Sequence, residues 1–179
     1  MARTTFQGPL RSLGGIYQQG PATIVEITSN TTLSPELHGG RIISVGGALV
    51  ANLTLTLPPI NAAANPVSSG PGQDPSTSNN EGVMYTIWVP TTISTSSLKI
   101  GTDLTDRFVG AVLSIDTDTS GAAVGFVSGA NDDFINFNGG TTGGVAGTFV
   151  QIYAIAALKY MVTGVVLGTG TVATPFANS

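Results

Sequence analysis

The chain has few side chains that can carry acid–base, metal or nucleophilic chemistry. Its 179 residues include no Cys, one His, six Lys and Arg, and ten Asp and Glu. Charged residues make up 9% of the chain, against about a quarter in an average soluble domain. We therefore expect no enzyme and predict no catalytic, cofactor-binding or metal-ligating residue. The composition favours a structural protein held in an assembly.

The missing cysteines and the sparse basic residues exclude further classes. Without cysteine, a disulfide-stapled extracellular module is impossible. The formal net charge is −4 and the six basic residues are scattered along the chain, whereas nucleic-acid binding needs clustered Lys and Arg. Residues 1–15 contain no apolar secretory core, and the longest apolar runs are much shorter than a membrane span. We expect neither a nucleic-acid partner nor a membrane partner.

Strand and turn chemistry is abundant instead. Apolar residues alternate with other residues at 53–57, 83–89 and 158–163, and turn sequences at 39–40, 46–47, 120–121, 138–140 and 143–144 contain glycine. Further runs of β-branched or aromatic residues lie at 23–28, 41–45, 108–115, 123–127, 134–137, 148–155 and 165–172. Many short strands separated by glycine-rich turns predict an all-β protein. We expect an antiparallel β-sandwich or a jelly-roll-like barrel with an extended N-terminal arm.

Some of the predicted strands are apolar on both faces. The stretch from Phe149 to Ile155 is the clearest case, because both alternating sets of positions contain large apolar residues. A strand with one solvated face shows polar residues at every second position. Such strands should therefore lie inside the sandwich or at a subunit interface.

Two segments differ from the rest of the chain. Residues 1–21 hold Pro, Gly and Gln with little alternation, and we interpret them as an arm that a partner orders. Residues 22–179 form the predicted sandwich domain. Within it, residues 61–82 are rich in Pro, Ser and Asn and form a long loop insertion between two strands.

His38 is the one histidine and the first candidate for chemistry. With Glu36 as the group that orients it, it could act as a general base. However, no Ser or Cys lies in a nucleophile motif, and a triad needs several such groups together. A structural role for His38 is favoured.

The stretch from Asp116 to Gly121 has the start of a calcium-binding loop, with oxygen ligands at alternating positions before a glycine. Its twelfth position is Val127, where such a loop needs a bidentate Glu. A hairpin turn is therefore favoured. If Asn131, Asp132 and Asp133 met this turn in space, a weak ion site would become less improbable.

Two carboxylates and a set of aromatics complete the candidates. Asp103 and Asp106 could act as a carboxylate pair, but a turn beside Arg107 is the favoured interpretation. The aromatics could form a sugar-stacking platform, although aromatics at period two are more often core residues. This set consists of Trp88, Phe126, Phe134, Phe137 and Tyr153. The glycosylation sequons at Asn30 and Asn52 need a secretory pathway, so we attribute them to chance.

Several stretches of the chain resemble small structural proteins of tailed bacteriophages, of the kind found in phages of cyanobacteria and other aquatic hosts. The arm begins with TTFQGPLRS at residues 4–12 and continues with Gly14 and Gly15. The body contributes TTL (31–33), LTLTLP (53–58), Gly82 with YTIWV (85–89), YMVTG (160–164), GTG (168–170) and PF (175–176). The resemblance covers most of the chain but not residues 61–81.

The resemblance implies a capsid decoration, or cement, protein. Members of this family stabilise the outer surface of icosahedral heads, commonly as homotrimers, by bridging subunits of the major capsid protein. We accordingly expect synthesis in the host cytoplasm, a place on the capsid surface, and capsid contact through the arm residues Arg3, Phe6 and Arg11. The alternative is a virion fibre or knob module that binds host surface carbohydrate. An enzyme such as a depolymerase is the least favoured class.

Overall fold

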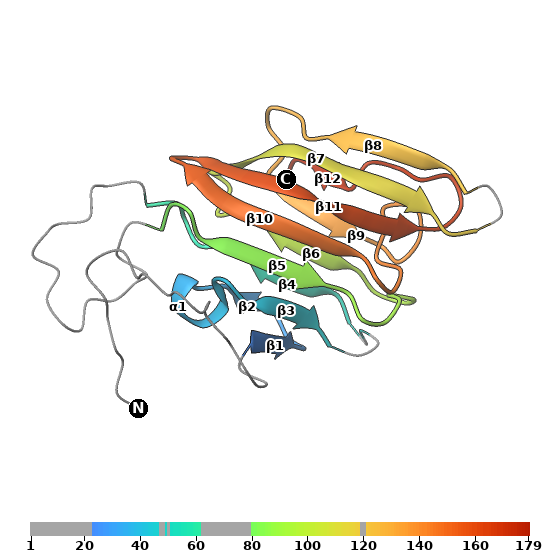
Figure 1. Ribbon diagram of the computed structural model, residues 1–179, viewed down its shortest axis with the longest axis horizontal. Helices are drawn as coiled ribbons and strands as arrows, with labels where there is room; N and C mark the ends of the chain where they lie inside the picture. The colour runs from blue at the N-terminus through green and yellow to red at the C-terminus, as the bar shows by residue number, and fades with distance from the viewer. Residues whose placement is uncertain (1–22, 47–48, 50, 62–79, 119–120) are drawn as a thin grey trace, which may run out of the picture.

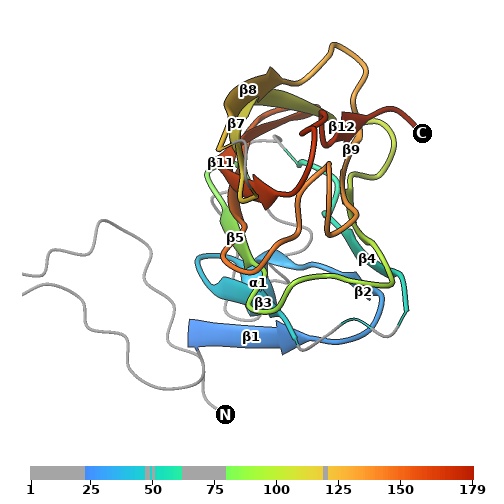
Figure 2. The same cartoon turned by 90° about the vertical axis from the view of Figure 1, so that its right-hand side faces the viewer.

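The protein folds into two β-sheets packed face to face. The computed structural model describes residues 23–46, 49, 51–61, 80–118 and 121–179. The seven-stranded sheet has the order β1-β3-β5-β10-β11-β7-β8, and the five-stranded sheet has the order β12-β9-β6-β4-β2. Figure 1 shows the larger sheet in front, and Figure 2 shows the two sheets as separate layers. The predicted all-β sandwich is confirmed.

The strands of the seven-stranded sheet are β1 (Ile24–Ile27), β3 (Ile42–Val45), β5 (Met84–Trp88), β7 (Arg107–Asp116), β8 (Ala123–Val127), β10 (Phe149–Ala156) and β11 (Lys159–Gly168). Those of the five-stranded sheet are β2 (Thr31–Thr32), β4 (Leu53–Thr56), β6 (Leu98–Gly101), β9 (Phe134–Phe137) and β12 (Phe176–Ala177). One short helix, α1 (Pro35–His38), lies between β2 and β3. Its N-cap is Ser34, whose hydroxyl accepts from Leu37 N.

The first half of the chain winds between the two sheets like a coil. From β1 to β7, odd-numbered strands join the larger sheet and even-numbered strands join the smaller one. Consecutive strands within a sheet are therefore parallel, as in β1 with β3 and β2 with β4. The coil is interrupted when the hairpin of β10 and β11 inserts between β5 and β7.

This winding corrects one part of the predicted architecture, because the sheets are mixed rather than antiparallel. Among the described strands, the pairs β1·β3, β3·β5, β7·β11, β2·β4 and β4·β6 are parallel. The other pairs, β5·β10, β10·β11, β7·β8, β6·β9 and β9·β12, are antiparallel. A period of two fixes which side chains share a face, but it is the same for parallel and antiparallel partners. The alternation therefore could not distinguish them.

One apolar core fills the space between the sheets. The alternating leucines of β4 and of the residue after it point into the core, since Leu53, Leu55 and Leu57 are buried, as the alternation predicts. Tyr85 and Ile87 of β5 enter it from the other sheet. Phe108 and Tyr160 meet there with ring centroids 6.5 Å apart. A chain without cysteine thus relies on apolar burial in this single core.

Two asparagines connect successive turns of the coil. Asn30 stands one residue before β2, and its Oδ1 accepts a hydrogen bond from Thr54 N at 2.8 Å. Asn52 stands one residue before β4, and its Oδ1 accepts from Ser97 N at 3.0 Å. Each side chain thereby satisfies a backbone donor on the next turn. The two sequons of the sequence thus begin with residues that have equivalent structural roles.

We expect Asn52→Ala to lower the free energy of unfolding by about 1 kcal/mol, because Ser97 N loses its partner at a solvent-exposed corner. Asn52→Asp keeps an acceptor oxygen at the same place, so it should cost less. Urea unfolding of the two variants and the parent measures both values. Equal stability of Asn52→Ala and the parent would show that the side chain does not join the turns.

Asn61 and Asn80, at either side of residues 62–79 in the predicted insertion, are hydrogen-bonded to each other. Asn80 is buried, and its backbone N donates to Asn61 O at 3.1 Å while its Oδ1 accepts from Asn61 N at 2.8 Å. Its Nδ2 donates to Pro59 O at 3.0 Å. The two ends of the segment are therefore tied together. Residues 62–79, like the predicted arm at 1–21, lie outside the residues that the structure describes.

Candidate interaction surface

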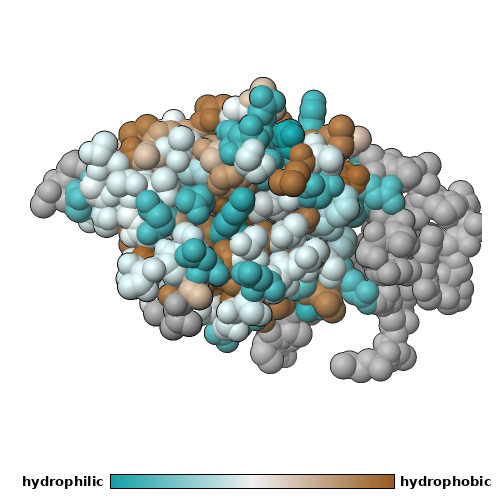
Figure 3. All heavy atoms as spheres, turned by 180° about the vertical axis from the view of Figure 1, so that it is seen from behind, coloured by the Kyte–Doolittle hydropathy of each residue, from teal (hydrophilic) through white to brown (hydrophobic). Residues whose placement is uncertain are grey.

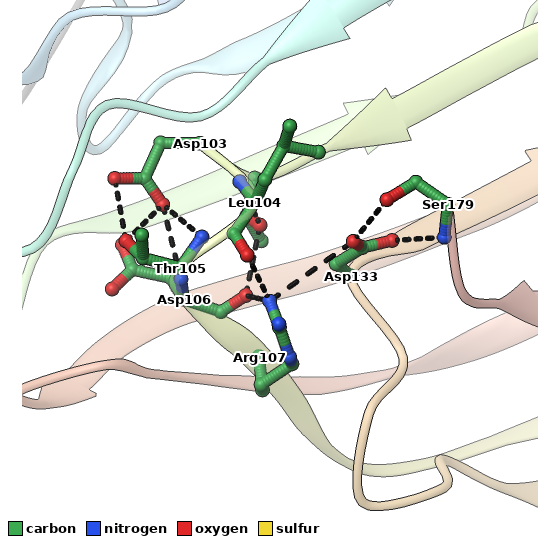
Figure 4. A network of polar contacts seen from close by, with 8 residues as sticks. Asp103, Leu104, Thr105, Asp106, Arg107, Asp133 and Ser179 are labelled. Carbon is green, nitrogen blue, oxygen red and sulfur yellow. Dashed lines mark hydrogen bonds and ion pairs between the residues drawn. The ribbon is translucent and has the colours of Figure 1, made fainter.

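The carboxylates of Asp103 and Asp106 hold a turn, as favoured from the sequence (Figure 4). Asp103 Oδ1 accepts from Thr105 N and from Asp106 N, each at 3.0 Å. Burial alone would raise the pKa of Asp103, but these hydrogen bonds outweigh it and lower the pKa below its ordinary value. Leu104 adopts a positive φ of 75° within the turn, and Arg107 Nη1 donates to its carbonyl oxygen.

Asp106 serves a different segment from Asp103. Its side chain is buried, and Oδ2 accepts from Ile60 N at 2.9 Å. Burial is the main cause that raises its pKa above the ordinary value, and the negative charge of Asp103 adds to the effect. The two groups thus hold separate backbone segments.

Asp133 joins the end of the described chain to the body of the protein. Its carboxylate is buried and accepts from Ser179 N at 3.0 Å and from Ser179 Oγ at 2.6 Å. Arg107 Nη1 lies 4.0 Å from Asp133 Oδ2 (Figure 4). This buried carboxylate is therefore occupied in holding the chain beside β12.

The predicted Asp116 turn does not meet the Asn131–Asp133 stretch. Asp116 ends β7, where its N donates to Ala122 O, and Asp118 Oδ2 accepts from Gly170 N at 2.7 Å. Asp132, by contrast, bonds through its carbonyl oxygen to Phe108 N near the start of β7. At about 3.3 Å per residue, Phe108 and Asp116 are roughly 26 Å apart along this strand. The condition for a shared ion site is not met, and the hairpin interpretation is correct.

His38 has a structural position. Its imidazole is buried, and Nδ1 accepts a hydrogen bond from Ser34 N at 2.9 Å, across the turn of α1. Burial lowers the pKa of His38, and the nearby positive charge of Arg41 lowers it further. With one ring nitrogen engaged by the backbone, this histidine stabilises the connection between β2 and β3.

The five aromatics do not form one platform. Phe137 is fully buried, and Phe126 packs against the core. Trp88 and Tyr153 lie on the outer face of the larger sheet, whereas Phe134 lies on the outer face of the smaller sheet under Lys99 Nζ, 3.9 Å from the ring centroid. The interpretation as core residues is therefore correct for Phe137 and Phe126. It is wrong for Trp88, Tyr153 and Phe134.

The outer face of the seven-stranded sheet is strongly apolar. We call it the apolar face and define it by two cross-strand rows on β5, β10, β11 and β7. The first row is Trp88, Phe149, Val165 and Leu113. The second row is Met84, Tyr153, Met161 and Val109. Figure 1 views these strands from this side.

A short polar row separates the two apolar rows. It consists of Thr86, Gln151 and Thr163, neutral residues that pair across β5, β10 and β11. Charged residues of the larger sheet lie at its margins, with Glu26 on the edge strand β1 and the pair Arg107 and Lys159 at one end of β7 and β11. The middle of the apolar face is therefore uncharged.

The outer face of the five-stranded sheet has the opposite character. Thr54 and Thr56 of β4 point outward, next to Lys99 of β6, and Asn136 of β9 pairs with that lysine. Figure 3 looks at this side of the molecule, where hydrophilic and near-neutral residues cover most of the surface. The two faces of the sandwich therefore differ sharply in the contacts that they can make.

Two tyrosines lie buried at one end of the core. Tyr160 Oη donates to Pro58 O at 2.6 Å, and burial raises the pKa of both Tyr160 and Tyr85. The Tyr85 hydroxyl finds no hydrogen-bond partner within the part of the chain that the structure describes. Both rings are inaccessible to solvent, so they serve the core rather than a ligand.

Two further kinds of feature, a metal-ligand cluster and a membrane-spanning helix, are absent from the described residues. They contain no group of three or more His, Cys, Asp or Glu side chains that could hold a metal ion. No described helix has the length and hydropathy needed to cross a bilayer. The predicted capsid-contact residues Arg3, Phe6 and Arg11 lie outside the described residues.

No protein-family model, no curated protein and no solved structure matches this chain. Its function is therefore inferred from its own residues and surfaces.

The sequence shows that some strands are apolar on both sides, but it does not show which sheet face these side chains share. Phe149 and Tyr153 alternate with buried residues of β10, so both faces of the strand are apolar. Met161 likewise alternates with the buried residues Tyr160 and Val162 of β11. What the sequence could not supply was the order of strands that places these residues in common rows, because β10 and β11 insert between strands much earlier in the chain.

Proposed function

We propose that this chain is a structural virion protein that decorates and cements the outer surface of an icosahedral phage head. In this role it forms a homotrimer and bridges subunits of the major capsid protein. The observation that carries the proposal is the uncharged apolar face on a compact sandwich, which gives the protein a surface to bury against neighbours. The resemblance of the arm and the strand stretches to cement proteins supports the same role.

The mechanism is mechanical. A head filled with DNA pushes its shell outward, and a protein that bridges several shell subunits adds its binding free energy to the energy needed for rupture. Burial of apolar area supplies such energy at about 25 cal/mol per Å². The sparse charge of the chain suits this task, because few ionic groups need to be dehydrated on contact.

The arm is the proposed anchor on the capsid. We expect deletion of residues 1–15 to preserve the fold and to abolish binding to heads, because this stretch holds Arg3, Phe6 and Arg11 outside the alternating strands. The measurement is co-sedimentation of the full chain and of the truncated chain with heads purified without this protein. The full chain should bind at a fixed ratio to the major capsid protein.

A full-length variant provides the matched control. Arg3→Ala, Phe6→Ala and Arg11→Ala together keep the length of the arm but remove its two charges and its aromatic ring. This triple variant should bind as poorly as the truncated chain. Unchanged decoration by the truncated chain would contradict the role of the arm, and failure of the full chain to bind heads would contradict the proposed function.

A carbohydrate-binding fibre or knob is the second candidate. Trp88 and Tyr153 favour it, because both aromatics lie on an outer face where a sugar ring could stack. Binding of the full chain to host surface glycans, lost in Trp88→Ala, would support this candidate. A cement protein should instead show binding to heads and no glycan binding.

A further inference from the structure

We propose that the apolar face is where copies of this chain meet one another. The inference rests on the proposed function and deepens it, since it locates the interface of the proposed homotrimer. It also assigns different tasks to the two sides of the sandwich. The seven-stranded sheet faces other copies, and the five-stranded sheet does not.

The distribution of exposed apolar side chains carries the inference. Most of the large exposed apolar residues of the described chain belong to the outer side of the seven-stranded sheet, whereas the outer side of the five-stranded sheet has none of them. Those on this outer side are Ile24, Ile42, Trp88, Leu113, Phe149, Ile155 and Met161, each between 37% and 48% exposed, together with Val127 of the edge strand β8, which is 74% exposed. Contiguous apolar surface of this kind marks an interaction site.

The size of the face suits a stable interface. The outer side of β5, β10, β11 and β7 has a projected area of about 500 Å², from four strands at about 4.8 Å spacing with a mean length of about eight residues at about 3.3 Å each. The protruding side chains and the flanking strands β3 and β8 enlarge this area. A standard interface buries about 800 Å² on each partner, so the face approaches what one partner needs.

Its chemistry fits a second copy better than another kind of partner. Permanent homo-oligomeric interfaces are more apolar than transient ones, which resemble the general protein surface. The two rows of the apolar face carry aromatic, Met and aliphatic side chains, and the short row between them is polar but uncharged. Each copy has a formal net charge of −4, so two copies repel one another overall. A contact through an uncharged surface adds no further repulsion between charges brought close together. The apolar face is such a surface.

The absence of cysteine allows a direct test with single labels. Thr163→Cys places a thiol in the middle of the apolar face, and Thr32→Cys places one on the five-stranded sheet. Both positions are exposed strand threonines, so the substitution is the same and each thiol starts from an exposed site in the single chain. Light scattering gives the oligomeric state of each variant, and a bulky maleimide reagent then reports the accessibility of each thiol.

The expected result is an oligomer in which Cys at 32 reacts fully while Cys at 163 stays unmodified. Both thiols should react equally in denaturant. In addition, Phe149→Glu should yield folded monomers, whereas Thr32→Glu should leave the oligomer intact. If Phe149→Glu fails to fold, the labelling of positions 163 and 32 alone tests whether the apolar face is the interface.

Two outcomes would overturn the inference. One is a full chain that remains monomeric at micromolar concentration, and the other is an oligomer in which position 163 reacts as fast as position 32. Binding to heads is measured separately. An oligomer joined through the apolar face that does not bind heads would overturn the proposed function and leave this inference standing. Decorated heads with an accessible position 163 would overturn this inference alone.

Discussion

Gly139→Ala should destabilise the protein by more than about 3 kcal/mol, a loss large enough to be diagnostic of a specific steric conflict. A Cβ at residue 139 would lie 1.5 Å from Ile93 O, which is backbone and cannot rotate away. The residue also has a positive φ of 75°, a conformation that favours glycine. The segment after β9 could move away from residue 93 only by breaking its own contacts, such as the hydrogen bond from Ile93 N to Gly144 O at 3.0 Å.

Gly170→Ala is the matched control. Gly170 has a similar φ of 69°, but a Cβ there would have no atom within 4 Å. We expect a loss of about 1 kcal/mol from the backbone conformation alone. Urea unfolding of both variants separates the conformational cost from the steric cost, and a Gly139→Ala chain that cannot fold while Gly170→Ala folds gives the same answer. Equal losses in the two variants would show that the close approach to Ile93 imposes no constraint.

The inward-facing residues were predictable because alternation and burial follow one rule. The leucines of residues 53–57 and the set Tyr85, Ile87 and Val89 each share a face in the sequence and are buried in the structure. Alternation failed where a turn changes the direction of the chain. Leu158 continues the pattern of Tyr160 and Val162, yet it sits in the turn before β11 with a φ of 63° and is 55% exposed.

The pairing of strands was not predictable from the same pattern. The coil of parallel strands depends on corner residues such as Asn30 and Asn52, which bond to the next turn rather than to nearby residues. Strands as short as β2 and β12 have two residues each, too few to show any period. Their existence depends on partners that are distant in the sequence.

The candidate surface was partly predictable. A strand that is apolar on both sides has to bury one side in the core and leave the other for a neighbour, and β10 does the first of these. The sequence did not show that its second side joins Trp88 and Met161 in shared rows. Nor did it show that Phe134 lies on the other sheet beneath Lys99, since aromatics on either face have the same spacing.

Tyr160→Phe should lower the free energy of unfolding by about 1–3 kcal/mol, because Pro58 O would lose the hydrogen bond that it now accepts in the interior. Tyr85→Phe is the matched control, since it removes the same atom from a ring that is equally buried. The Tyr85 hydroxyl has no partner among the described residues. Its removal should therefore leave the stability unchanged or raise it, because an unsatisfied buried hydroxyl costs free energy.

The opposite expectations test whether the polar atoms at this end of the core act through their hydrogen bonds or only through their volume. Both substitutions remove one oxygen and leave a cavity of the same size, so a pure packing effect would give two similar losses. Thermal or urea unfolding of the two variants measures the difference. A loss in Tyr85→Phe equal to that in Tyr160→Phe would mean that the two hydroxyls contribute through their volume and not through the hydrogen bond to Pro58 O. A loss confined to Tyr160→Phe would mean that this hydroxyl fixes the start of the segment that Asn80 closes at its other end.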